Sequence, residues 1–130
     1  MEDNLTILGV GITRTVMVGD RMLSPVRSQQ VVNHSPDGFN WGYSGSGPAQ
    51  LALAILLEAM PQEAAELYYH HFNAIVIKAL PSDGFKIKVN MRKYIDRMAN
   101  GQETVYSDIV ETLIYVPSTF RVKMNKNNDI

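Results

Sequence analysis

Most of the side chains that could recognise a ligand lie in one segment, residues 33–50. It reads NHSPDGFNWGYSGSGPAQ and holds four of the nine glycines and the only tryptophan of the chain. Pro48 suits the first position of a helix, with Gly47 as its N-cap and Gln50 reaching back to the cap. A helix start offers free N–H groups and a partial positive charge. We therefore expect a phosphate or carboxylate to bind where Ser44, Gly45, Ser46 and Gly47 lead into the helix.

The known nucleotide motifs do not fit this segment. Gly42 and Gly47 have the spacing of a Walker motif, but Pro48 stands where its lysine must be. A third glycine is missing at Gln50, which excludes the dinucleotide fingerprint. The same glycines are also what a tight entry into a buried helix requires. An anion site and a purely structural loop therefore both stay open.

Three aromatic residues alternate through the segment. In an extended chain Phe39, Trp41 and Tyr43 would share one face, with Asn40 and Gly42 on the other. Trp41 or Tyr43 would then be able to stack a nucleotide base. The alternative is that these rings fill the core beside the helix, and we expect this of Phe39 in particular.

His34 lies next to Ser35 and close to Asp37, which raises the possibility of a hydrolase. Residues so close in sequence seldom form a catalytic triad, because a triad depends on spatial geometry. We expect His34 to donate a hydrogen bond to a ligand and assign no catalytic residue. His70 and His71 are adjacent on a predicted helix and point about 100° apart, so we expect no metal site and no cofactor.

The residues that we expect to contact the ligand either lie in this segment or supply a counter-charge to an anion. They are His34, Ser35, Asn40, Trp41, Tyr43, Ser44, Gly45, Ser46, Gly47, Gln50, Arg14 and Arg27.

Apolar periodicity predicts the elements that must position these residues. Residues 5–23 form a β-hairpin with its turn at Gly19-Asp20, and residues 26–32 form a short strand or an extended connector. The helix that starts at Gly47 is apolar all round, so it is buried. Further elements are a helix over 62–80 with Ala64, Tyr68, Phe72, Ile75 and Ala79 on its core face, a strand over 85–89, a helix from Asn90 to about Ala99, and a strand over 109–116.

The amino-acid composition indicates the class of protein. The chain has 130 residues, 45% of them hydrophobic, a formal net charge of -1 and no cysteine. We expect one α+β domain over residues 1–130, with a small antiparallel sheet packed on two main helices, one of them buried. Residues 101–130 form a C-terminal extension with a frayed end. The charge excludes binding to duplex nucleic acid, and we expect no membrane span and a cytoplasmic location.

One string of residues resembles a known family. His34-Ser35-Pro36, Gly38-Phe39, Trp41-Gly42-Tyr43 and the run from Gly45 to Ala54 resemble the core of a small domain-of-unknown-function family of bacteria, archaea and their phages. The resemblance covers about residues 16–95, although the family usually has a tryptophan near Phe85. It implies an α+β domain and a phage or mobile-element context, and it brings no activity or catalytic residue.

Three hypotheses follow. The leading one is a non-catalytic binding protein that captures a small phosphorylated ligand, by analogy with the phage sponges that sequester nucleotide immune messengers. The alternative is a homo-oligomeric interaction protein whose strand over 109–116 pairs with another copy. The third is a phosphoester hydrolase that uses His34 and Asp37.

Overall fold

The fold is built on an antiparallel sheet. In the computed structural model, residues 3–117 are described, and they form a five-stranded sheet of order β3-β2-β1-β4-β5. Every neighbouring pair of strands is antiparallel. The strands are β1 (Asn4–Val10), β2 (Thr15–Val18), β3 (Arg21–Met22), β4 (Gly84–Asn90) and β5 (Val110–Tyr115).

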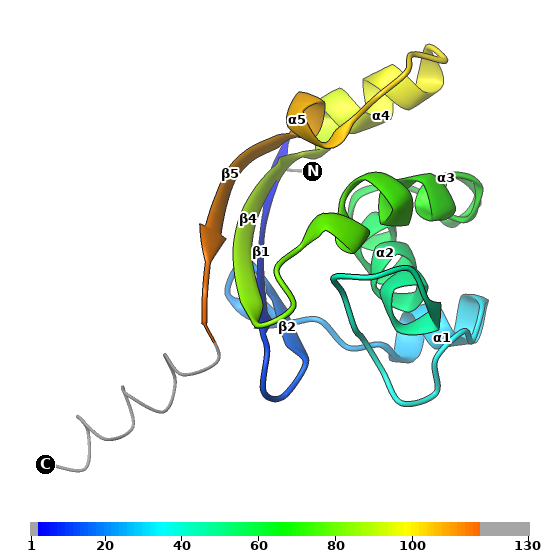
Figure 1. Ribbon diagram of the computed structural model, residues 1–130. Helices are drawn as coiled ribbons and strands as arrows, with labels where there is room; N and C mark the ends of the chain where they lie inside the picture. The colour runs from blue at the N-terminus through cyan, green and yellow to red at the C-terminus, as the bar shows by residue number, and fades with distance from the viewer. Residues whose placement is uncertain (1–2, 118–130) are drawn as a thin grey trace, which may run out of the picture.

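Helices cover one face of this sheet. Figure 1 shows α2 and α3 side by side on one side of the strands, with α1 below them and α4 and α5 at the upper end. The helical segments are α1 (Val26–Val31), α2 (Ser46–Ala59), α3 (Gln62–Ile75), the 3-10 turn η1 (Ile77–Ala79), α4 (Met91–Ala99) and α5 (Tyr106–Ile109). All of α2 is buried except Ser46 and Glu58. The predicted α+β class, with two main helices of which one is buried, is confirmed.

Strand register decides which side chains enter the core. Ile7 of β1 stands opposite Ile87 of β4, and both are buried against the helices. Successive side chains of a strand point to opposite faces, so Lys86 and Lys88 lie on the uncovered face, where both are exposed. The predicted hairpin, the strand over 85–89 and the strand over 109–116 are all present. Asn90 caps α4 as predicted, because its Oδ1 accepts from the Lys93 N–H at 2.9 Å.

Several predicted elements were wrong in detail. Residues 26–31 form a helix and not a strand, because buried Ser28 bonds the Pro25 carbonyl at 2.8 Å and packs beneath α2. The long helix predicted over 62–80 ends at Ile75 and continues as η1. Its core face was predicted in part: Phe72 is buried as expected, but Ala65 and Tyr69 are buried in place of Ala64 and Tyr68. The short helix α5 was not predicted.

Two further expectations concern the C-terminal end of the chain and the presence of a membrane-spanning helix. The frayed end falls mainly on residues 118–130, which lie outside the described residues. No helix among residues 3–117 is long and apolar enough to cross a membrane.

Candidate functional site

The glycine-rich loop packs tightly around the start of α2. Gly42 has φ of +86°, a conformation that favours glycine, and its N–H donates to the Ile77 carbonyl at 3.0 Å. A Cβ on Gly47 would lie 2.7 Å from the Cβ of Asn40, so only glycine allows this approach without a shift. Gly42 and Gly47 therefore have a structural role.

The helix α2 begins two residues earlier than predicted. Gly45 and not Gly47 is the N-cap, in extended conformation, and no side chain caps the first turn. The Tyr43 ring lies directly against Gly45, where a Cβ would approach it to 2.5 Å. Tyr43 is 47% exposed, and Ser44 and Ser46 are exposed beside it. An accessible aromatic ring thus lies next to an uncapped start of a 14-residue helix.

Trp41 has no exposed face that a base could stack on. It is fully buried, its Nε1–H donates to the Pro81 carbonyl at 2.9 Å, and its ring packs edge-on against Phe85 at 5.1 Å. The Arg14 guanidinium lies over the ring, 4.6 Å from its centroid. The expected common face of the three aromatics is wrong, because Phe39 and Trp41 lie in the core and Tyr43 does not.

The two expected counter-charges contact the protein itself. Arg14 donates to the Ser82 carbonyl at 2.6 Å, and Arg27 donates to the Leu57 carbonyl at 3.2 Å. Arg14 also lines a cavity of about 200 Å³ together with Asp37 and Gly38. We therefore no longer assign either arginine to the phosphate.

Gln50 is a positioning residue rather than a ligand contact, because it is fully buried. Its Oε1 accepts from the backbone N–H groups of His34 at 2.8 Å and Ser35 at 3.0 Å. Its Nε2 donates to the Ser28 hydroxyl at 2.9 Å and the Val32 carbonyl at 3.1 Å. The predicted reach of Gln50 back to the helix cap is wrong. The amide instead fixes residues 32–35 against α2.

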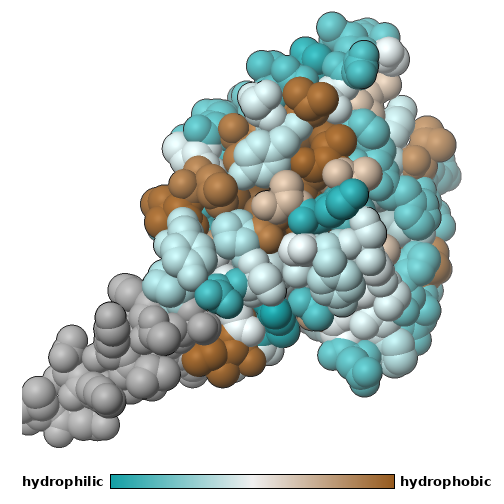
Figure 2. Space-filling model, viewed as in Figure 1, coloured by the Kyte–Doolittle hydropathy of each residue, from teal (hydrophilic) through white to brown (hydrophobic). Residues whose placement is uncertain are grey.

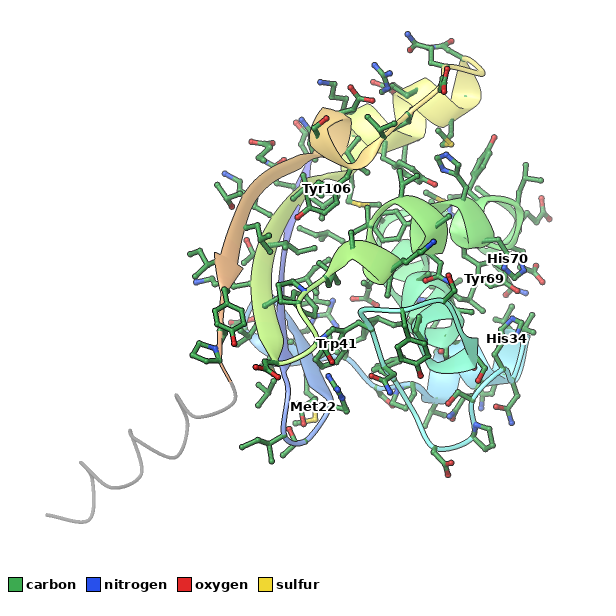
Figure 3. The ribbon with its side chains drawn as sticks, viewed as in Figure 1. Met22, His34, Trp41, Tyr69, His70 and Tyr106 are labelled. Atoms are coloured by element: carbon green, nitrogen blue, oxygen red, sulfur yellow. The ribbon has the colours of Figure 1, made fainter. Side chains whose placement is uncertain are left out.

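His34, held in this way, meets two residues of α3. Its Nε2 lies 2.6 Å from the Tyr69 hydroxyl, and its ring is 5.8 Å from that of His70. Figure 3 shows the three side chains gathered where the loop after α1 approaches α3. Burial, together with the negative charge of Glu66, raises the pKa of Tyr69. Sequence reasoning missed Tyr69, because it assigned the core face of α3 to the preceding residue.

This arrangement bears on the hydrolase hypothesis and on the two neighbouring histidines of α3. His34 is paired with Tyr69 and not with Asp37, which is exposed. His71, next to His70, points to the other side of α3 and lies 3.0 Å from the Tyr94 hydroxyl through Nδ1. No group of three or more histidine, aspartate or glutamate residues within 3–117 is placed to hold a metal ion.

Comparison with known proteins assigns the chain to a family. An antiparallel sheet covered on one face by helices, with a glycine-rich loop closing around a buried helix, defines a small α+β domain. The chain belongs to the family described as a family of unknown function (DUF6166), whose model matches residues 8–110. The searches of curated proteins and of solved structures found no match.

Proposed function

We propose that the protein is a non-catalytic binding protein that captures a small phosphorylated ligand. The observation that carries the proposal is the exposed Tyr43 ring beside the uncapped N-terminus of α2. Anions bind at helix starts because the first N–H groups lack partners within the helix and carry partial positive charge. An adjacent aromatic face adds stacking of about 1–3 kcal/mol for a base. Together these features favour a nucleotide.

The proposed contacts to the ligand are of two kinds, one to its phosphate and one to its base. The phosphate accepts from the Ser46 N–H and from the hydroxyls of Ser44 and Ser46, and the base stacks on Tyr43. His34 and Ser35 lie on the flank of the site, one helical turn further along α2, where Gln50 holds their backbone. In a phage context such a protein would act in the host cytoplasm as a sponge for a nucleotide immune messenger.

The direct test is a thermal-shift screen with cyclic nucleotides, cyclic oligonucleotides and ADP-ribose derivatives. A ligand at a thousand times its Kd stabilises the fold by about 4 kcal/mol. For a domain of this size the midpoint of unfolding should then rise by roughly 10 °C or more. The ligand should be recovered chemically unchanged after heating. A screen in which no compound shifts the midpoint would contradict the proposal.

Ser46→Asp separates binding from stability. A carboxylate at the first residue of α2 stabilises the helix by about 0.5 kcal/mol through its dipole but repels phosphate. We expect the variant to unfold at the same temperature or higher and to lose the ligand-induced shift. Ser107→Asp, the same change in the short helix α5, is the control and should keep that shift. Tyr43→Ala should weaken binding without unfolding, since the ring is half exposed.

A second candidate function, self-association, has its own support. The β5 side chains of Leu113, Ile114 and Tyr115 are 46%, 56% and 54% exposed, and β5 is the last strand of the sheet. A terminal strand with apolar side chains is a template for pairing with another chain. Sedimentation velocity over a range of concentrations tests this function, and a monomer throughout would contradict it.

A further inference from the structure

Arg14 has an unusual backbone conformation. It ends the turn between β1 and β2 with φ of +57°, and it is the only residue other than glycine within residues 3–117 whose φ is positive. Its N–H donates to the Val10 carbonyl at 2.8 Å and closes the turn. Glycine and asparagine adopt this left-handed conformation more readily than arginine does. The presence of arginine therefore directs attention to what its side chain contacts.

The Arg14 guanidinium contacts two segments that are distant in the sequence. It donates to the Ser82 carbonyl at 2.6 Å and to the Ser82 hydroxyl at 3.4 Å, and it lies over the Trp41 ring at 4.6 Å. A guanidinium suits this position because it donates hydrogen bonds within its plane while its face stacks on an aromatic ring. Asp37 lines the same cavity as Arg14, yet neither residue belongs to an ion pair within residues 3–117. The guanidinium is thus held by the carbonyl and the ring and not by a carboxylate.

The glycine-rich loop is anchored to the segment 77–82 as well. The Trp41 Nε1–H donates to the Pro81 carbonyl at 2.9 Å, and the Gly42 N–H donates to the Ile77 carbonyl at 3.0 Å. Figure 3 shows Trp41 between the strands and the helices. Together with the guanidinium, these bonds join three parts of the fold, namely the first hairpin, the loop and the approach to β4.

Of these parts, the hairpin is the rigid one. Val10 pairs with Gly84 of β4, and Gly11 packs so closely against the Asp83 carbonyl that a Cβ would not fit. Residues 32–45, by contrast, contain neither helix nor strand, and such segments open more readily than a sheet. Figure 2 shows that the lower half of the viewed face, where the turn and the loop lie, is mostly hydrophilic apart from one apolar patch at its tip. The guanidinium therefore ties an irregular loop to a rigid sheet.

We propose that Arg14 is a positioning residue for the ligand site and holds the glycine-rich loop in the arrangement that presents Tyr43. This inference rests on the proposed function and adds a residue that does not contact the ligand. Arg14 acts through Trp41 and Gly42, which directly precede Tyr43 in the chain. Without it the loop opens more often, and Tyr43 leaves its place beside Gly45. A ligand that binds only the closed loop then binds more weakly, in proportion to the fraction that is open.

Hydrogen exchange followed by NMR tests the hold on the loop without any ligand. The full-length variants are Arg14→Asn, which fits the left-handed backbone but lacks the guanidinium, and Arg14→Lys, which keeps the charge but lacks the planar fork. The readouts are the Gly42 amide and the Trp41 indole N–H, which both donate to the segment 77–82. We expect both protons to exchange about tenfold faster in Arg14→Asn, because a hydrogen bond from a charged group is lost, and to show an intermediate rate in Arg14→Lys.

Two controls separate a local effect from a global one. Arg92→Asn, the same change at an exposed arginine of α4, should leave both protons as they are in the unmodified chain. The amide protons of β4, a strand paired on both sides, should exchange at the same rate in all variants. A rise in β4 as large as that at Gly42 would show that Arg14 stabilises the whole fold and would overturn the inference.

The second measurement is the Kd of the compound that gives the largest thermal shift among the cyclic nucleotides, cyclic oligonucleotides and ADP-ribose derivatives. We expect Arg14→Asn to bind this compound several-fold more weakly than Arg92→Asn, which should bind it as the unmodified chain does.

The outcomes distinguish the inference from the proposed function. Faster exchange at Gly42 and Trp41 together with weaker binding supports the inference. Unchanged exchange in Arg14→Asn overturns it whether or not a ligand is found. Faster exchange with an unchanged Kd overturns the link to the ligand site and leaves the proposed function standing. A screen in which no compound binds overturns the proposed function and, with it, the role of Arg14 in binding.

Discussion

At the residue scale, Gln50 organises more of the candidate site than any residue that faces solvent. Its amide has two acceptor positions and two donor hydrogens, and all four are used within α1, α2 and the segment between them. A buried polar group is costly unless it is hydrogen-bonded, so this set of bonds specifies one arrangement of residues 28–35. The position of His34 against Tyr69 follows from it.

Replacing Gln50 with leucine should therefore destabilise the protein strongly. The volume is nearly kept, but two backbone N–H groups and one carbonyl lose their partner in the interior, and the Ser28 hydroxyl keeps only its bond to the Pro25 carbonyl. We expect the free energy of unfolding to fall by about 3 kcal/mol, measured by urea denaturation. Gln30→Leu, at an exposed position of α1, is the control and should change the free energy little. Equal losses in the two variants would contradict the role assigned to Gln50.

At the element scale, the glycine-rich loop is both a packing device and a candidate site. Gly42 and Gly47 let the loop approach η1 and Asn40, whereas Tyr43, Ser44 and Ser46 remain accessible at the start of α2. The two interpretations left open by the sequence thus apply to different residues. Structural glycines place the loop, and its exposed side chains are free to bind.

Two glycines of this loop make a matched pair for testing the packing role. Gly42 and Gly38 both have positive φ, +86° and +110°, but only at Gly42 would a Cβ meet a backbone atom, the Leu80 carbonyl oxygen at 2.9 Å. Gly42→Ala should cost about 3 kcal/mol and Gly38→Ala about 1–2 kcal/mol, since both introduce backbone strain but one adds a collision. Thermal or urea unfolding measures both. A larger loss at Gly38 would refute the tight packing of Gly42.

At the scale of the whole molecule, buried tyrosines make stability depend on pH in alkaline solution. Burial raises the pKa of Tyr69, Tyr94 and Tyr106 above the ordinary value of 10. Above pH 10 the unfolded chain releases these protons while the folded chain keeps them. The unfolded state then binds fewer protons, so the free energy of unfolding falls as pH rises. Below pH 10 this stabilisation is fully present.

Tyr94→Phe should reduce that dependence on pH. Tyr94 is fully buried and its hydroxyl contacts His71 and the Tyr68 carbonyl. The variant should lose about 1 kcal/mol near neutral pH through the missing hydrogen bonds. Above pH 10, however, its free energy of unfolding should decline less steeply with pH than that of the unmodified chain. Parallel declines in urea titrations would show that another group is responsible.

Local sequence patterns predicted most of the elements. The hairpin, the buried helix α2, the cap at Asn90 and the strand β5 were confirmed, because alternation, apolar content and capping chemistry are properties of neighbouring residues. The match over residues 8–110 confirmed the resemblance to a small family of unknown function. The strand proposed over 26–32 failed because the bonds of Ser28 to α2 outweigh the β preference of its valines.

The sequence by itself determined the α+β class, the order of most elements and the place of the glycine-rich loop. Only the tertiary structure decided that Trp41 and Gln50 lie in the core, that Arg14 and Arg27 contact carbonyl groups, and that Tyr69 meets His34. The reason is physical. Secondary structure depends on residues a few positions apart. The exposure of a side chain and its hydrogen-bond partners depend instead on residues brought together from distant parts of the chain, as Trp41 and Pro81 are.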